Sequence, residues 1–90
     1  MDQVIEIPID GILDLHPFRP SEVPSLVKEY IEACLSKGIY EIRIIHGKGK
    51  GVLRQTVHHI LEAHPRVAAF HDAHDSSGWG ATVAYLRRPK

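Results

Sequence analysis

Two short stretches of the chain combine residue types that do proton and phosphate chemistry. The first is LDLH at residues 13–16, where a carboxylate, Asp14, and an imidazole, His16, alternate with two leucines. Residues i and i+2 of a β-strand share one face, so Asp14 and His16 point to the same side. A carboxylate beside an imidazole orients and tunes a general base. Taken alone, the two residues are equally compatible with an edge pair that bonds to backbone or to each other.

The second stretch is HGKGKGVLR at residues 46–54, where glycines and lysines alternate. It lies between a predicted strand and a predicted helix, a position where backbone N–H groups and the helix dipole favour an anion. Glycines let a phosphate approach the backbone, and lysines add positive charge. A flexible turn is the alternative for this loop alone. We expect phosphate contacts from Gly47, Lys48, Gly49, Lys50, Gly51 and Arg54.

The glycine spacing does not match the loops that bind nucleotide cofactors. A mononucleotide loop requires G-x-x-x-x-G-K-[ST], but here Val52 stands where a hydroxyl would hold magnesium. A G-x-G-x-x-G dinucleotide loop would need a glycine at that same position. No cofactor is therefore predicted, apart from a divalent cation such as Mg²⁺ if the substrate is DNA.

Histidines and aspartates elsewhere in the chain resemble metal ligands by type but not by arrangement. HDAHD at residues 71–75 alternates across the two faces of a predicted strand, and His58 and His59 are adjacent on a predicted helix. No such group converges as a zinc site requires, so we predict no metal site.

Hydrophobic periodicity predicts an alternation of strands and helices. Apolar residues recur at i, i+3, i+4 and i+7 from Val23 to Leu35, with Ser21 as the expected N-cap and Gly38 closing the helix. A second helix begins near Gly51 and ends before Pro65. Strands are predicted at 11–16, 39–46, 67–73 and 81–86.

The order β-α-β-α-β-β predicts a two-layer α/β sandwich, in which helices connect parallel neighbouring strands. Its four-stranded mixed sheet has the last strand antiparallel. The expected organisation is a lead-in arm over residues 1–9, one domain over 10–87 and a basic tail over 88–90.

The carboxyl ends of the first two strands lie at the same sheet edge, so His46 is expected beside Asp14 and His16. Trp79, in the loop before the last strand, is a candidate for stacking on a base or for local packing.

Composition is that of a soluble, cytoplasmic domain. The 90 residues contain a single cysteine, Cys34, and no apolar run long enough to span a membrane. The formal net charge is zero with histidine neutral, which argues against a general polyanion binder. Charge is nevertheless uneven, because Arg43, Lys48, Lys50 and Arg54 fall within one short stretch.

The two motifs, in this order and followed by G-ATVAYL at residues 80–86, resemble the Smr (small MutS-related) domain over roughly residues 10–87. The resemblance implies a sandwich like the C-terminal domain of bacterial initiation factor three. It also implies nucleic-acid binding, with endonuclease activity on DNA or RNA in some members. Asp14 and His16 correspond to the family's catalytic pair, and His46 to Gly49 correspond to its phosphate-contacting loop. Pro17 departs from the glycine that commonly follows LDLH.

The predicted function is therefore a nucleic-acid endonuclease that cleaves RNA or nicks DNA. In the RNA version His16, held by Asp14, removes the proton of a ribose 2′-hydroxyl, and His46 protonates the leaving oxygen. The alternative is a non-catalytic module that binds nucleic acid or the ribosome. The expected partners are nucleic acid and a ribosome or repair complex; a protein-interaction domain stays open as a third class.

Overall fold

The structure is a computed structural model that describes residues 7–47, 51–73 and 80–89. Helices and strands follow one another in the predicted β-α-β-α-β-β order. They are β1 (Ile12–Asp14), α1 (Val23–Ser36), β2 (Glu41–Ile45), α2 (Val52–Ala63), β3 (Val67–Asp72) and β4 (Ala81–Leu86), with a short 3-10 turn at Pro20–Glu22 before α1. In the described residues no helix has the length and apolar character needed to cross a membrane.

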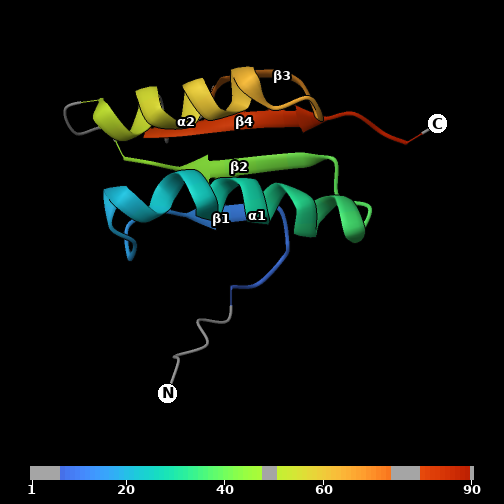
Figure 1. The fold of residues 1–90 in the computed structure, drawn as a ribbon, viewed down its shortest axis with the longest axis horizontal. Helices are drawn as coiled ribbons and strands as arrows, with labels where there is room; N and C mark the ends of the chain where they lie inside the picture. Colours follow the sequence, from blue (N-terminus) through green and yellow to red (C-terminus); the bar gives the residue numbers. More distant parts are fainter. Residues whose placement is uncertain (1–6, 48–50, 74–79, 90) are drawn as a thin grey trace.

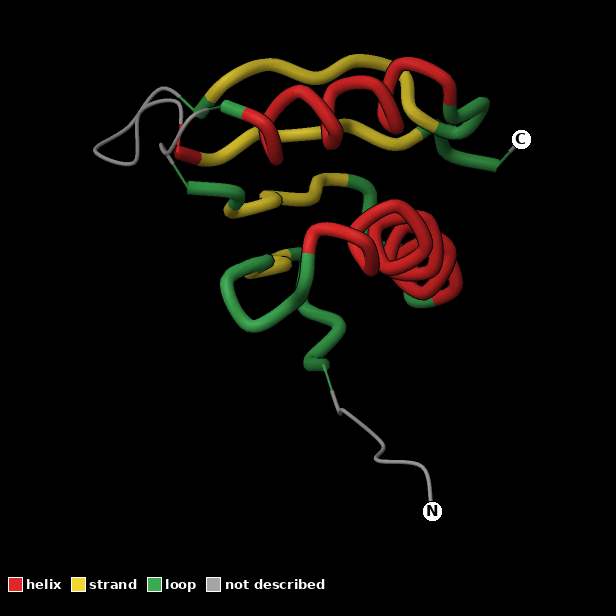
Figure 2. Tube along the Cα trace, turned by 60° about the vertical axis from the view of Figure 1, so that its left-hand side comes forward, coloured by secondary structure: helices red, strands yellow, loops and turns green. Residues whose placement is uncertain are grey.

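The four strands form one mixed sheet in the order β1-β2-β4-β3. β1 and β2 are parallel, and β4 runs antiparallel to both of its neighbours, as predicted. Both helices cover the same face of the sheet, which confirms the two-layer sandwich (Figure 1). The prediction that both helices connect neighbouring strands holds only for α1. β4 pairs with both β2 and β3 and so lies between them, and α2 crosses over it (Figure 2).

Alternation along the strands separates a core face from an open face. Leu13, Ile42 and Ile44 turn toward the helices and are at most 1% exposed. The core is completed by apolar residues of both helices, among them Val27 and Leu61. We call the opposite sheet face, which carries no described helix, the open face. The registers place on it Ile12, Asp14, Arg43, Ile45, His71, Val83 and Tyr85.

The two ends of α1 can be compared with the capping residues predicted from the sequence. The predicted N-cap, Ser21, lies inside the 3-10 turn, so that prediction is wrong. The turn that leads into α1 is stabilised instead by Glu22, whose Oε1 accepts the Arg19 N–H at 2.8 Å. The C-terminal end follows the prediction, because Gly38 has a φ of 73° and donates to Leu35, while Ile39 donates to the carbonyl of Cys34.

Tyr30 fixes the position of β1. Its hydroxyl oxygen accepts the N–H of Gly11 at 3.0 Å and lies 3.1 Å from the carbonyl oxygen of Ile12. β1 has only three residues and one neighbouring strand, so this buried contact from α1 anchors it at the sheet edge. Ile7 and Ile9 also pack against the core, so the last part of the predicted lead-in arm belongs to the folded body.

The two-layer packing predicts the cost of truncating one core side chain. Ile44 is fully buried in the central strand β2, so Ile44→Ala should lower the free energy of unfolding by about 2–5 kcal/mol. Ile12, which is 52% exposed, provides the matched control, with an expected change within about 0.5 kcal/mol. Urea denaturation followed by circular dichroism measures both. Equal losses in the two variants would contradict the assignment of faces.

Candidate nucleic-acid interface

Asp14 and His16 form the predicted pair at the carboxyl end of β1. Oδ1 of Asp14 accepts the backbone N–H of His16 at 2.9 Å and lies 2.6 Å from Nδ1 of its ring. These hydrogen bonds, the backbone one first, lower the pKa of the Asp14 carboxyl. An ionised carboxylate only accepts, so Nδ1 of His16 carries the proton. Leu15 is fully buried, and its N–H donates to Ile45, which fixes the backbone between the two polar residues.

Nε2, the other ring nitrogen of His16, faces Gly47, the first glycine of the loop. A Cβ atom added to Gly47 would lie 3.5 Å from Nε2 of His16, so the imidazole faces this glycine. Gly47 has a φ of 84°, a backbone conformation that side chains disfavour. His16 is 65% exposed, which leaves Nε2 accessible to a ligand. The pair and the start of the loop therefore converge, as the strand ends predicted.

His46 does not join the open-face pair. It lies on the core side of the sheet and is 6% exposed. Nδ1 lies 2.9 Å from the carbonyl oxygen of Gly47, and Nε2 lies 2.8 Å from Oγ1 of Thr82. Burial lowers the pKa of His46 and so favours the neutral ring. With both nitrogens occupied inside the protein, this placement does not fit the predicted role of proton donor.

The hydrogen bonds around His46 have a defined direction. A carbonyl oxygen only accepts, so Nδ1–H of His46 donates to Gly47. In the neutral ring Nε2 must then accept the hydroxyl hydrogen of Thr82. The Thr82 oxygen in turn accepts from Nε2–H of His58, which lies 2.9 Å away. This chain, here called the buried relay, links α2 through β4 to the carbonyl of Gly47.

Arg54 and Asp72 extend the buried relay toward the edge of the sheet. Nε and Nη2 of Arg54 donate to the two carboxylate oxygens of Asp72 at 3.0 and 2.7 Å. The Arg54 guanidinium lowers the pKa of Asp72. Asp72 also lies 3.6 Å from Nε2 of His58. Arg54, predicted to contact nucleic acid, is therefore engaged in a two-pronged ion pair within the protein.

Several predicted contacts lie outside the described residues. These are Lys48, Gly49, Lys50 and Trp79. Gly51 is described: it is the N-cap of α2 with a φ of 79°, so the loop ends at the first turn of this helix. The N–H groups of such a first turn have no partner within the helix and favour an anion. The N–H of Gly47 donates to Gly80 at 2.8 Å and is not available to a phosphate.

Sequence reasoning missed the residues that support the loop. Thr82 is fully buried. A threonine in an apolar strand does not by itself predict hydrogen bonds to two histidines. Arg54 and His58 are four residues apart on α2 and thus share a face, while Asp72 alternates with His71 along β3. That spacing could have paired Arg54 with Asp72. It could not have located Thr82, whose neighbours depend on β4 lying beside β2.

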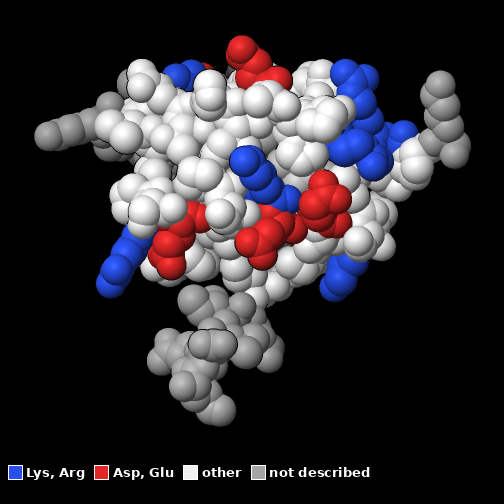
Figure 3. Space-filling model, in the orientation of Figure 1, with Lys and Arg blue, Asp and Glu red and all other residues white. Residues whose placement is uncertain are grey.

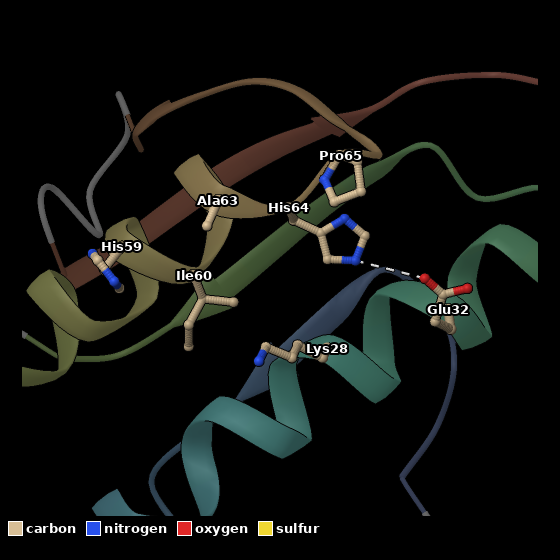
Figure 4. Close-up of a pocket in the computed structure, with 7 residues that line it drawn as sticks. All are labelled: Lys28, Glu32, His59, Ile60, Ala63, His64 and Pro65. Carbon is tan, nitrogen blue, oxygen red and sulfur yellow. Dashed lines mark ion pairs between the residues drawn. The ribbon is translucent and has the colours of Figure 1, made fainter.

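The described residues show no metal cluster. Among them, no three His, Cys, Asp or Glu side chains lie where they could hold a metal ion. A hollow of about 390 Å³ lies between α1 and α2, away from the open face (Figure 4). One wall is held by His64, whose Nε2 lies 3.6 Å from a Glu32 oxygen. The hollow is lined by Lys28, Glu32, His59, Ile60, Ala63, His64 and Pro65.

Comparison with known families and curated proteins finds a consistent set of relatives. The Smr domain model matches residues 13–87. A ribosome rescue factor SmrB from Shewanella baltica is 40% identical over 77 residues, which are 86% of this chain and 43% of that protein. An endonuclease MutS2 from Solidesulfovibrio magneticus is 36% identical over 77 residues, or 84% of this chain and 10% of that protein. The chain thus spans less than half the length of these relatives.

Solved structures share the fold. The Smr domain of Thermus thermophilus MutS2 superposes with a TM-score of 0.80 and 35% identity, covering 86% of this chain and 98% of that one. YdaL, a stand-alone small MutS-related protein from Escherichia coli, gives a TM-score of 0.79 and 29% identity, over 90% of this chain and 67% of that one. Both likenesses extend over most of this chain.

The buried relay predicts how stability depends on pH. Burial lowers the pKa values of His46 and His58, so the unfolded chain binds protons more readily than the folded one. Stability should therefore be full above about pH 6.5 and fall as the pH drops from there through the lowered pKa values. Urea titrations between about pH 7.5 and 5 measure this slope.

Two substitutions test whether the buried relay causes this pH dependence of the free energy of unfolding. His46→Gln should reduce it, even though the variant is less stable at every pH. His59→Gln, at an exposed position on α2 next to His58, should leave it unchanged. An undiminished slope in the His46→Gln variant would contradict a buried, neutral His46.

Proposed function

The chain belongs to the Smr domain family, and on that premise we propose that it is a metal-independent RNA endonuclease acting through Asp14 and His16. The observation that supports this activity is the orientation of one imidazole. Nδ1 of His16 is bound to Asp14, and Nε2 lies beside Gly47 at the start of the glycine loop. A base with its proton-accepting atom next to a phosphate-binding loop is the arrangement that transfer from a ribose hydroxyl requires.

The proposed reaction is an internal transfer at phosphorus. Nε2 of His16 takes the proton of the 2′-hydroxyl, and the imidazolium that forms is stabilised by Asp14. The 2′ oxygen forms a bond to phosphorus while the bond to the 5′ oxygen breaks. The departing oxygen takes a proton from water, since both nitrogens of His46 are engaged in the buried relay. The products are a 2′,3′-cyclic phosphate and a 5′-hydroxyl.

Negative charge on the phosphoryl oxygens must be stabilised by hydrogen-bond donors. The first turn of α2 begins at Gly51 and offers N–H groups at the positive end of a helix dipole. Lys48 and Lys50 would add positive charge from the same loop. The buried relay contributes indirectly: it holds the Gly47 carbonyl inward, and so fixes how the loop leaves β2.

The names of the relatives indicate the substrate class. SmrB is named a ribosome rescue factor and MutS2 an endonuclease, and both match this chain over 77 residues. We infer that this chain acts on RNA, with the ribosome as its partner. Nicking of DNA would require an activated water in place of the internal hydroxyl, and a divalent cation such as Mg²⁺ would assist it.

A non-catalytic docking module is the second candidate, favoured by two features next to His16. Pro17 has no N–H, and the N–H of Gly47 is already donated to Gly80. Two backbone donors adjacent to the pair are thereby removed from phosphate binding. In this case Asp14 and His16 would contact RNA without cleaving it.

Replacing His16 separates the two candidates. His16→Ala should slow cleavage of labelled single-stranded RNA in EDTA by about 100-fold or more, because the general base is lost. RNA binding, measured by fluorescence anisotropy, should be largely retained. His59→Ala removes an exposed histidine from the hollow between α1 and α2, away from the open face, and should leave the cleavage rate unchanged.

The remaining outcomes are equally informative. Retained cleavage in the His16→Ala variant would exclude His16 as the base. Binding without cleavage in the wild type would favour the docking module. Nicking of supercoiled plasmid that needs magnesium would move the substrate to DNA.

A further inference from the structure

A second hollow lies at the opposite end of the sheet from His16. It measures about 460 Å³, within the range of ligand pockets, and it opens where β4 leaves the sheet beside the start of β2. Two tyrosines contribute to its wall, Tyr40 on the helix side of the sheet and Tyr85 on the open face, and we call it the tyrosine hollow. Its lining residues are Gly38, Ile39, Tyr40, Glu41, Tyr85, Leu86 and Arg88.

Both tyrosines are held in place by neighbouring groups. The guanidinium carbon of Arg88 lies 4.8 Å from the centre of the Tyr40 ring, in a cation–π contact. Nδ1–H of His71 donates to the carbonyl of Asp72 at 2.7 Å, so in the neutral ring Nε2 accepts the Tyr85 hydroxyl at 3.0 Å. The hollow therefore presents flat aromatic and guanidinium surfaces whose orientation is set before a ligand arrives.

Positive charge gathers next to the tyrosine hollow. The N–H of Arg87 donates to the carbonyl of Arg66 at 2.7 Å, and Nη2 of Arg66 donates back to the carbonyl of Arg87 at 3.0 Å. With Arg88 following directly, three arginines are tied together where the chain leaves β4. Figure 3 shows basic side chains gathered at this end of the molecule, while acidic side chains lie over α1.

The tyrosine hollow and the Asp14–His16 pair are connected along the sheet. Asp14 pairs with Ile45 at one end of β2, and Tyr85 pairs with Glu41 at the other. These four steps along β2 separate the two places by about 13 Å in the strand direction. From Asp14 a single strand can follow the open face to Tyr85, and several more nucleotides carry it around the end of β2 to Tyr40 and Arg88 on the helix side.

Resting on the proposed function, we propose that the tyrosine hollow is a base-binding subsite for single-stranded RNA held away from the cleaved bond. Flat rings and a guanidinium plane are the surfaces on which unpaired bases stack. Arg66 and Arg87 complement the phosphates that flank such a base. The one carboxylate of the hollow, Glu41, would repel a phosphate but accepts a hydrogen bond from the amino group of a base.

The test compares RNA of two lengths whose riboses are 2′-O-methylated, so that the proposed reaction cannot consume them. An oligonucleotide of about 12 nucleotides reaches both places, whereas one of about 3 nucleotides does not. Arg88→Ala should weaken binding of the long oligonucleotide about tenfold and leave the short one unchanged. Arg88 is exposed, so its removal does not disturb the core.

Matched variants distinguish stacking from general charge. Lys28→Ala removes the same charge from the exposed surface of α1 and should weaken binding of the long oligonucleotide less than twofold. Arg88→Lys keeps the charge but loses the planar group, so it should restore only part of the affinity. Tyr40→Ala should weaken binding in the same way as Arg88→Ala.

Three results would overturn the subsite. They are wild-type affinity in Arg88→Ala, equal weakening by Lys28→Ala, or full recovery in Arg88→Lys. Each leaves the endonuclease proposal intact, provided the wild-type protein binds and cleaves unmodified RNA. A wild-type protein that binds neither length would instead remove RNA as the substrate, and the subsite with it.

Discussion

The hydrogen bond from Nδ1 of His46 to the carbonyl of Gly47 is the contact on which the candidate site depends. It draws that carbonyl toward the core and determines how the chain leaves β2. On the other side of the sheet the same glycine lies against Nε2 of His16. One residue thus joins a buried polar network to an exposed base. A side chain at position 47 would require a strained φ, and its Cβ would be in van der Waals contact with the imidazole.

Burial makes this arrangement stable in only one protonation state. Thr82 can donate a single hydrogen, and the neutral His46 ring requires it. If His46 were protonated, its Nε2–H would donate to Thr82, and the Thr82 hydroxyl could then donate only to His58 in its other tautomer. The cost of a buried charge therefore selects neutral His46. Arg54 and Asp72 complete the network at its edge, with their charges paired to each other.

The sequence predicted the fold well because periodicity reports which face of each element is buried. The alternation of Leu13, Asp14, Leu15 and His16 placed the carboxylate and imidazole together on the open face, and the structure agrees. Alternation along a strand could not show the role of His46, because a histidine at the end of a strand can face either solvent or the core. Pairing of β4 with β2 brings Thr82 to that ring, and strand order is a tertiary property that local patterns do not contain.

Arg54 illustrates the same limit for charge. A basic residue in a glycine-lysine stretch suggests phosphate binding, yet the helical turn places it against a carboxylate eighteen residues away. The arginines beyond β4, which the sequence indicated only as a basic tail, gain significance from the tyrosines beside them. Spatial neighbours decide which charges are available to a ligand.

The most direct test of the account is to follow cleavage of one RNA and of the same RNA with a single 2′-deoxyribose at the cleaved position, both in EDTA. The account predicts that the unmodified RNA yields a 2′,3′-cyclic phosphate and a 5′-hydroxyl, and that the deoxyribose abolishes cleavage at that bond alone. Cleavage of the deoxy-substituted bond at an undiminished rate, or products ending in a 3′-hydroxyl and a 5′-phosphate, would contradict it.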